Sequence, residues 1–193
     1  MDMHHVPSDA DLIGRGKQGA VYKLSSDRCL KWYVNERHAR LECRSYHMAA
    51  GSPLIPKLYG CGPQYIVMEY IQGECLQKVL RQKRALTMQQ SGHILYIIDE
   101  MTRLGFTRID IALAHIFIQE TQTKQVCKII DLVHAYSRVY DIPKVLFKGL
   151  FKLGLLAVFL EHAKELDREK YEKWIDHVRT RSDRYGSFRT YID

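Results

Sequence analysis

The sequence predicts an α+β fold with a strand-rich N-terminal part and a mainly helical remainder. Short runs of β-branched and aromatic residues, separated by glycine, serine and proline turns, occupy residues 12–34 and 54–70. Apolar residues then recur at helical spacing over residues 75–104 and 144–178. Apart from one helix expected over residues 36–50, strands come first and helices follow, so the order favours an α+β arrangement over alternating β–α units.

Composition narrows the class of protein. The chain has 193 residues, 46% of them hydrophobic, which is enough to bury a core in one domain or two small lobes. Five cysteines form no Cys-x-x-Cys pair and are odd in number, so we expect reduced thiols and no zinc site. The net charge of +7 favours phosphate-bearing partners. Nucleic-acid binding is not expected, since repeats, zinc-finger spacing and aromatic–basic clusters are missing from the sequence.

The ends of the chain carry no targeting signal that we recognise. Residues 1–9 lack the charged-then-apolar order of a secretory signal, and no uninterrupted apolar run reaches the roughly 18 residues of a membrane span. We therefore expect a cytoplasmic protein without a transmembrane segment. Residues 1–9 and the charged residues 179–193 are predicted to be tails.

The first predicted strands enclose a glycine-rich turn that contains Gly14, Gly16 and Gly19. Glycines let a backbone pass close to phosphates and expose its amides to them. In a dinucleotide-binding fold the same spacing opens a helix. Here Val21 and Tyr22 favour a second strand, so the sequence predicts a strand–turn–strand hairpin.

A lysine and a glutamate follow this hairpin. Lys31 lies in the predicted strand 29–34, where its charge faces solvent or needs a partner. A helix is expected over residues 36–50, with Asn35 as its N-cap. Glu42 falls within the apolar stripe of that helix and therefore requires a buried cation, for which Lys31 is the candidate. Glu36, in the first turn, is better explained by the helix dipole.

The next segments predict two strands and two helices. Strands are expected over residues 54–59 and 65–70, separated by a turn at residues 60–63. Helical periodicity covers residues 75–83 and 87–104, and Gly105 is a suitable C-cap for the second helix.

Two acidic residues flank a predicted hairpin. Asp110 precedes the apolar run 116–118, Asp131 closes the run 129–130, and the polar residues 119–125 would form the turn. Each aspartate alone is more often a turn former. If both project at one edge of the hairpin, one carboxylate can orient an attacking hydroxyl while the other holds a metal on nucleotide phosphates.

The order of these features over about residues 10–135 resembles that of protein kinases. The resemblance implies a two-lobed protein-kinase-like fold, with a β-rich N-lobe at residues 10–70 and an abbreviated helical C-lobe at residues 71–178. It is similar to small atypical, RIO-like kinases and to minimal bacterial Ser/Thr kinases. It also implies ATP and Mg²⁺ or Mn²⁺ as cofactors.

The resemblance assigns catalytic and metal-binding roles. Asp110 would orient the acceptor hydroxyl, and Lys31 would hold the α- and β-phosphates while it pairs with Glu42. Asp131 would bind the metal, and His115 occupies the place of the second metal ligand. Adenine and the phosphates would contact the glycine loop, a covering valine, the gatekeeper and the hinge backbone: Gly14, Gly16, Gly19, Val21, Met68, Glu69 and Tyr70.

The sequence departs from the kinase pattern at several positions. His115 replaces an asparagine, Leu132 and Val133 replace the Phe-Gly after the metal-binding aspartate, and no Ala-Pro-Glu follows. Ile109 replaces an arginine that pairs with a phosphorylated loop, so no such regulation is expected. The expected function is ATP-dependent transfer of the γ-phosphate to a hydroxyl, with Ser or Thr of a protein favoured as the acceptor. Two alternatives stay open: a small-molecule kinase, and a nucleotide-binding pseudokinase that acts as an interaction module. The phosphate acceptor is accordingly an unknown protein or small molecule.

The C-terminal part predicts two more helical segments. Residues 144–160 are the most apolar stretch, and Lys144, Lys148 and Lys152 form one basic stripe along it. A core helix with a solvated lysine face is favoured over a helix lying on an acidic membrane. Residues 166–178 predict a last amphipathic helix.

Overall fold

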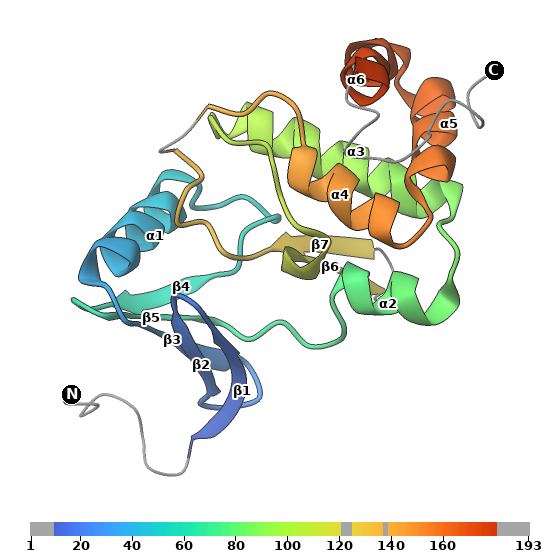
Figure 1. Ribbon diagram of the computed structural model, residues 1–193. Coiled ribbons are helices and arrows are strands. Elements are labelled where there is room, and N and C mark those ends of the chain that lie inside the picture. Colours follow the sequence, from blue (N-terminus) through green and yellow to red (C-terminus); the bar gives the residue numbers. More distant parts are fainter. Residues whose placement is uncertain (1–9, 121–124, 137–138, 181–193) are drawn as a thin grey trace. The chain divides into compact units, whose positions relative to one another are not determined.

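The computed structural model describes residues 10–120, 125–136 and 139–180 (Figure 1). They cluster into two compact units, one of Met1–Gly73 with Gln119–Arg138 and one of Glu74–Ile118 with Val139–Asp193. The expected tail at residues 1–9, residues 181–193 of the C-terminal tail, and residues 121–124 of the expected turn lie outside the described residues. Each unit is described by itself.

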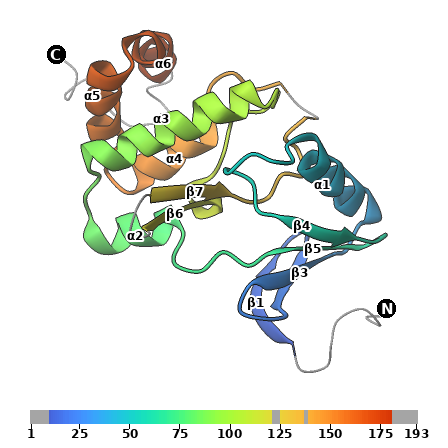
Figure 2. The same ribbon diagram turned by 180° about the vertical axis from the view of Figure 1, so that it is seen from behind.

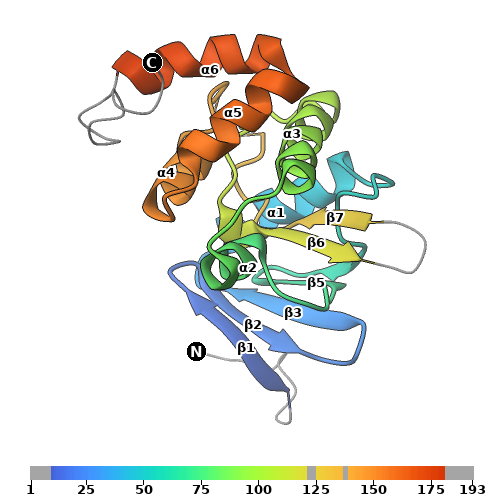
Figure 3. The ribbon, with the colours of Figure 1, turned by 90° about the vertical axis from the view of Figure 1, so that its right-hand side faces the viewer.

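The first unit is built on a five-stranded antiparallel sheet of order β1-β2-β3-β5-β4 (Figure 3). Its strands are β1 (Asp11–Gly16), β2 (Gly19–Lys23), β3 (Arg28–Tyr33), β4 (Leu58–Cys61) and β5 (Tyr65–Glu69). In the register of this sheet, Val21 on β2 and Ile66 on β5 lie directly opposite Lys31 on β3. Directly opposed residues project from the same face, so Lys31 has apolar neighbours on both sides.

Helix α1 (Glu36–Met48) packs against β3, β4 and β5. Asn35 caps it as expected, because its side chain accepts a hydrogen bond of 2.8 Å from the backbone N–H of Arg37. The buried face of the helix carries Ala39, Glu42, Ser45 and Tyr46. The helical periodicity of the sequence therefore placed Glu42 on the correct face.

The strand expected over residues 54–59 is wrong over residues 54–57, since β4 begins only at Leu58. Leu54 and Ile55 are buried without belonging to a strand, and the carbonyl of Leu54 accepts a bond of 3.0 Å from the N–H of Ile129. Pro53 and Pro56 flank them and have no N–H to donate to a strand ladder. Burial rather than strand formation explains this apolar run.

The second unit contains the helices other than α1 (Figure 2). They are α2 (Leu76–Lys83), α3 (Met88–Arg103), the 3₁₀ turn η1 (Leu113–His115), α4 (Lys144–Lys152), α5 (Leu156–Leu166) and α6 (Arg168–Thr180). A capping box starts α3: the Thr87 hydroxyl accepts from the Gln90 N–H at 3.1 Å, and the Gln90 side chain accepts from the Thr87 N–H at 3.0 Å. The core of the unit includes an aromatic cluster of Phe147, Phe159 and Trp174.

The apolar run expected as one helix over residues 144–160 is divided into α4 and α5. Gly154 stands just after α4 with a φ of 72°, a left-handed conformation that favours glycine. Its N–H donates to the Phe151 carbonyl at 2.9 Å, and the Leu155 N–H donates to the Leu150 carbonyl at 2.9 Å, which is a Schellman motif. On α4 Lys148 is exposed while Leu146, Phe147 and Leu150 are buried, as a core helix with a solvated lysine face requires.

Strands β6 (Ile116–Glu120) and β7 (Gln125–Ile129) form the expected two-stranded sheet. The five-stranded antiparallel sheet lies in the first unit and all described helices except α1 lie in the second, so the predicted α+β class is confirmed. Within the part of the chain that the structure describes, no helix is both long enough and apolar enough to span a membrane.

Candidate active site

The predicted ion pair between Lys31 and Glu42 is present in the first unit. Lys31 Nζ on β3 lies 2.7 Å from Glu42 Oε2 on α1, and the Glu42 side chain is fully buried. Glu36 is exposed in the first turn of α1, as expected of a residue placed by the helix dipole. A buried carboxylate with a cationic partner avoids the cost of an isolated buried charge.

Glu42 has two further donors that the sequence analysis missed. The Tyr33 hydroxyl donates to Glu42 Oε2 at 2.5 Å, and the backbone N–H of Leu132 donates to Glu42 Oε1 at 3.0 Å. Burial, and after it the charge of Glu42, raises the pKa of Tyr33, so the phenol stays protonated and donates. The signal for Tyr33 was its position two residues after Lys31 in a strand, which puts both side chains on one face.

Asp131 joins the same cluster. Its Oδ1 lies 3.0 Å from Lys31 Nζ, so the lysine stands between two carboxylates. Asp131 adopts a φ of 66°, a left-handed conformation that is uncommon outside glycine, although aspartate adopts it more readily than most residues. Backbone strain of this kind gathers at functional sites. The turn also brings the next amide, that of Leu132, onto Glu42.

The cluster keeps Lys31 charged. Burial alone would lower the pKa of this amine, but the carboxylates of Glu42 and Asp131 outweigh burial and raise the pKa above its ordinary value. Lys31 is therefore a fixed cation throughout the physiological range. Such a group suits the phosphate oxygens of a nucleotide.

The three glycines of the β1–β2 hairpin differ in what the fold requires of them. A Cβ on Gly19 would lie 1.7 Å from the backbone oxygen of Trp32, so the sheet itself demands glycine there. A Cβ on Gly14 would make an ordinary contact of 3.8 Å with Val21, and one on Gly16 would meet nothing within 4 Å. Packing within the protein therefore requires glycine at position 19 but does not require it at position 16.

Val21 and Met68 have different surroundings. Val21 is half-buried opposite Lys31, next to the charged cluster. Met68 is buried, and its sulfur accepts a bond of 2.9 Å from the Tyr46 hydroxyl of α1. Their expected roles, covering adenine and acting as gatekeeper, stay predictions.

The backbone amides of Glu69 and Tyr70 already donate hydrogen bonds within the protein. The Glu69 N–H donates to the Lys57 carbonyl at 2.8 Å, and the Tyr70 N–H donates to the Asp27 carbonyl at 2.9 Å. The Glu69 carboxylate accepts from Lys128 Nζ at 3.0 Å. The amides of these two residues are therefore already occupied within the protein.

Asp110 lies in the second unit and has a structural role of its own. It is buried, and its Oδ1 accepts a bond of 2.6 Å from the backbone N–H of Val145 in the first turn of α4. The carboxylate thus caps a helix N-terminus, where a negative charge is favourable. Burial nevertheless raises the pKa of Asp110, even though the Val145 amide and Arg108 act to lower it. This capping role could not be predicted from the sequence, because the partner lies 35 residues farther along the chain.

His115 ends η1 in the second unit and is half-buried. Its backbone N–H donates to the Ala112 carbonyl at 2.9 Å. Asp131 belongs to the first unit, so a shared metal site of Asp131 and His115 stays a prediction, as does the joint action of Asp110 and Asp131.

The cysteines correct one expectation. Cys43 on α1 and Cys61 on β4 form a disulfide, with their Cα atoms 6.3 Å apart, so the expectation that all thiols are reduced is wrong for this pair. Cys29, Cys75 and Cys127 are free thiols, and burial raises the pKa of Cys29 and of Cys127 to about 11. The pairing has no Cys-x-x-Cys spacing, because the contact is made by packing a helix on a strand.

Comparisons with known proteins agree with the fold. No protein-family model matches the chain. A protein of Bacillus subtilis (strain 168) named "Putative serine/threonine-protein kinase YrzF" is 28% identical over 149 residues, which cover 68% of this chain and 69% of the relative. A mutant kinase domain of Mycobacterium tuberculosis PknI superimposes with a TM-score of 0.50 and 16% identity, covering 80% of this chain and 84% of that domain.

The fold and the sequence relationship define a kinase-like protein. The chain has a protein-kinase-like fold, and its sequence is similar to that of a putative serine/threonine-protein kinase. Neither relative is named as a RIO-like kinase, so that part of the resemblance stays a prediction.

Proposed function

We propose that the chain is an ATP-dependent phosphotransferase that transfers the γ-phosphate to a hydroxyl, with Ser or Thr of a protein as the acceptor. The observation that carries the proposal is Lys31, held as a cation between Glu42 and Asp131 within one unit. The second carboxylate belongs to Asp131, whose left-handed backbone conformation is uncommon outside glycine and is found preferentially at functional sites.

The donor set of this cluster fits a metal–nucleotide complex. A carboxylate oxygen of Asp131 suits Mg²⁺ or Mn²⁺, which prefer hard oxygen ligands. When bound, the metal neutralises developing charge on the phosphates. Lys31 would bind the α- and β-phosphate oxygens, and Glu42, fixed by Tyr33 and Leu132, would keep the lysine in place.

The glycine hairpin supports the same proposal. Gly16 has open space where its side chain would be, and its glycine identity has no packing reason in the protein. Close approach of a phosphate to the backbone supplies such a reason. Asp110 would accept or orient the proton of the acceptor hydroxyl, since burial holds its pKa above the ordinary carboxyl value and closer to neutrality.

A second candidate is a nucleotide-binding pseudokinase. The hydrogen bond from the Val145 amide gives Asp110 a structural role that does not require catalysis. In that case Lys31, Glu42 and Asp131 would still bind nucleotide, and the protein would act through its surface.

The two candidates are separated by incubating the purified protein with ATP labelled at the γ-phosphate, Mg²⁺ or Mn²⁺, and two sets of acceptors. One set contains Ser- and Thr-bearing proteins and peptides, and the other contains small alcohols. The proposal predicts label on a protein hydroxyl, loss of transfer in Lys31→Ala, and retention in Lys57→Ala, an exposed lysine of the same unit. Label on small alcohols alone would indicate a small-molecule kinase. ATP binding without turnover would favour the pseudokinase.

A further inference from the structure

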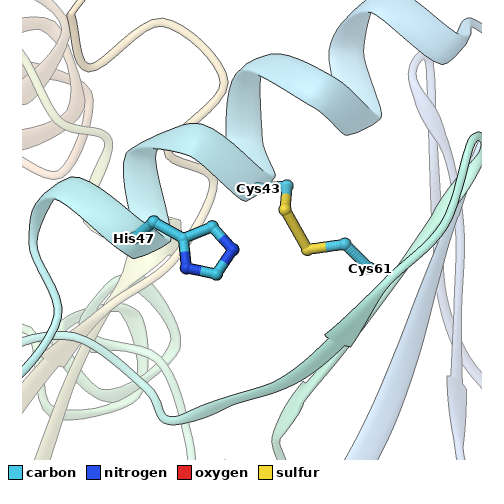
Figure 4. Close-up of side chains that lie close together, drawn as sticks. All are labelled: Cys43, His47 and Cys61. Carbon is cyan, nitrogen blue, oxygen red and sulfur yellow. A yellow bond between two sulfur atoms is a disulfide. The ribbon is translucent and has the colours of Figure 1, made fainter.

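A cluster of metal-ligand side chains lies outside the proposed nucleotide site. Cys43 and His47 are four residues apart on α1 and therefore share one face of the helix. Cys61 ends β4, and one ligand atom from each of the three residues lies within 4.8 Å of the other two. Figure 4 shows the imidazole of His47 on the same side of α1 as the Cys43–Cys61 bridge.

We propose that these three residues bind a Zn²⁺ ion when the disulfide is reduced. Zinc takes thiolate sulfur at about 2.3 Å and imidazole nitrogen at about 2.0–2.1 Å in a tetrahedral arrangement. Those bond lengths imply separations between ligand atoms of roughly 3.3–3.8 Å. The present separations are within reach of that geometry by rotation of side chains, and three protein ligands leave a fourth position for water or another ligand.

The redox chemistry decides whether the metal can bind. A dithiol or phosphine reductant supplies two electrons to the S–S bond, which breaks and takes up two protons to give two thiols. Zinc then replaces the two thiol protons, and both are released to solvent. The disulfide offers no thiolate, so the oxidised protein has no such site.

The surroundings favour a soft metal. The three residues line a surface groove of about 520 Å³ together with Arg40, Arg44, Met48 and Gly62, and the described residues lining it include no carboxylate. Two thiolates and a neutral imidazole make a Zn²⁺ site with no net charge, so the arginines do not repel it. Hard ions such as Mg²⁺ would find no oxygen side chains there.

The proposed zinc site would also restrain the helix that carries Glu42. Cys43 is the next residue on α1, and both the disulfide and a zinc ion would join that helix to β4. Only the metal-free dithiol would release the connection. Metal binding itself is independent of the proposed phosphotransferase function, so it is tested without any assay of transfer.

The test is a titration of the reduced protein with Co²⁺ under a phosphine reductant, followed by Zn²⁺. Tetrahedral cobalt–thiolate absorption should appear with one equivalent of Co²⁺ and disappear when Zn²⁺ displaces it. Cys43→Ser and Cys61→Ser should abolish the absorption. His47→Ala should weaken binding by at least the 10–100-fold that even outer-shell partners of a metal contribute.

Two controls keep the result interpretable. Cys75→Ser removes a half-buried free thiol elsewhere in the chain and should bind Co²⁺ as the wild type does. His47 is exposed, so His47→Ala retains the fold and tests the site even if a cysteine variant unfolds. The proposal is overturned if the reduced wild type shows no tetrahedral cobalt spectrum, if His47→Ala binds as tightly as the wild type, or if the oxidised protein binds equally well.

Discussion

Each unit buries one carboxylate that the proposed function depends on, and the two are stabilised in opposite ways. Glu42 receives a cation, a hydroxyl and an amide, from Lys31, Tyr33 and Leu132. Asp110 receives backbone amides at the start of α4, with Val145 closest at 2.6 Å. Charge pairing dominates at the first site and desolvation at the second, where burial raises the pKa of the carboxyl.

Burial alone therefore does not decide whether an acidic side chain stabilises or destabilises the folded protein. Removing Glu42 leaves a buried lysine with one partner fewer and a buried phenol without its acceptor. Neutralising Asp110 removes a charge that the protein holds at a cost. The first change should therefore destabilise the protein, and the second should not.

The largest effect is expected for Glu42→Ala. Breaking a buried ion pair by removal of one partner costs about 3–5 kcal/mol, and the free energy of unfolding in urea should fall by that order. Glu36→Ala, on an exposed position of the same helix, should change it by less than about 1 kcal/mol. Equal losses for the two variants would show that the buried cluster does not stabilise the first unit.

The glycine hairpin offers a matched pair. Gly19→Ala should lower the free energy of unfolding by about 1–3 kcal/mol or more, because its Cβ would overlap the Trp32 oxygen. Gly16→Ala should leave unfolding unchanged and weaken ATP binding, because only a bound phosphate would meet the new methyl group. If Gly16→Ala binds ATP as the wild type does, the loop does not approach the phosphates.

The pairing of Lys31 with Glu42 predicts coupling in nucleotide binding. Lys31→Ala and Glu42→Ala should each weaken ATP binding, and the double variant should depart from additivity by about 0.5–3 kcal/mol. Calorimetric affinities for the four proteins give the coupling energy directly. Additive effects would mean that Glu42 does not act through Lys31 in binding ATP.

Asp110→Asn should separate stability from catalysis. Because the pKa of Asp110 is raised on folding, the folded state holds this proton more tightly than the unfolded chain does. The resulting stabilisation is therefore complete below the ordinary pKa of 3.8 and is lost as the pH rises through the higher pKa of the folded state. Asparagine keeps an acceptor for the Val145 amide and carries no charge. The variant should have a free energy of unfolding at least as high as that of the wild type at neutral pH. The difference between the two should shrink as the pH falls, which urea titrations at several pH values would measure.

The same variant should lose roughly 10²–10⁴-fold in phosphoryl transfer if Asp110 handles the acceptor proton. Unchanged transfer in Asp110→Asn would assign the residue to helix capping alone. A variant much less stable than the wild type at neutral pH would contradict the desolvation argument.

His115→Asn is expected to have the smallest effect. If the imidazole is a metal ligand, the wild type should prefer Mn²⁺ or another transition metal, and the amide oxygen of the variant should raise Mg²⁺-supported activity. The measurement is activity against metal identity in both proteins. An unchanged preference would leave Asp131 as the metal ligand without His115.

The sequence predicted those parts of the fold and site that depend on short-range order. Asn35 as a cap, Glu42 on the buried face of α1 and the glycine hairpin follow from helix periodicity, capping chemistry and strand propensity. Lys31 could be paired with Glu42 because a charge within an apolar stripe demands a partner.

The features that the sequence analysis missed are made by packing between distant segments. The Leu132 amide on Glu42, the Val145 amide on Asp110 and the Cys43–Cys61 bridge join residues whose contact depends on the three-dimensional fold. The break between α4 and α5 is different, since Gly154 was a local stop signal within an apolar run and was overlooked.

The most direct test of the central claim is calorimetric binding of ATP with Mg²⁺ to the wild type, Asp131→Asn and Asp110→Asn. The claim is that the Lys31 cluster is the nucleotide–metal site. It predicts that the wild type binds, that Asp131→Asn loses the metal-dependent part of the affinity, and that Asp110→Asn binds like the wild type. A wild type that does not bind ATP, or an Asp131→Asn variant that binds it with undiminished metal dependence, would contradict the claim.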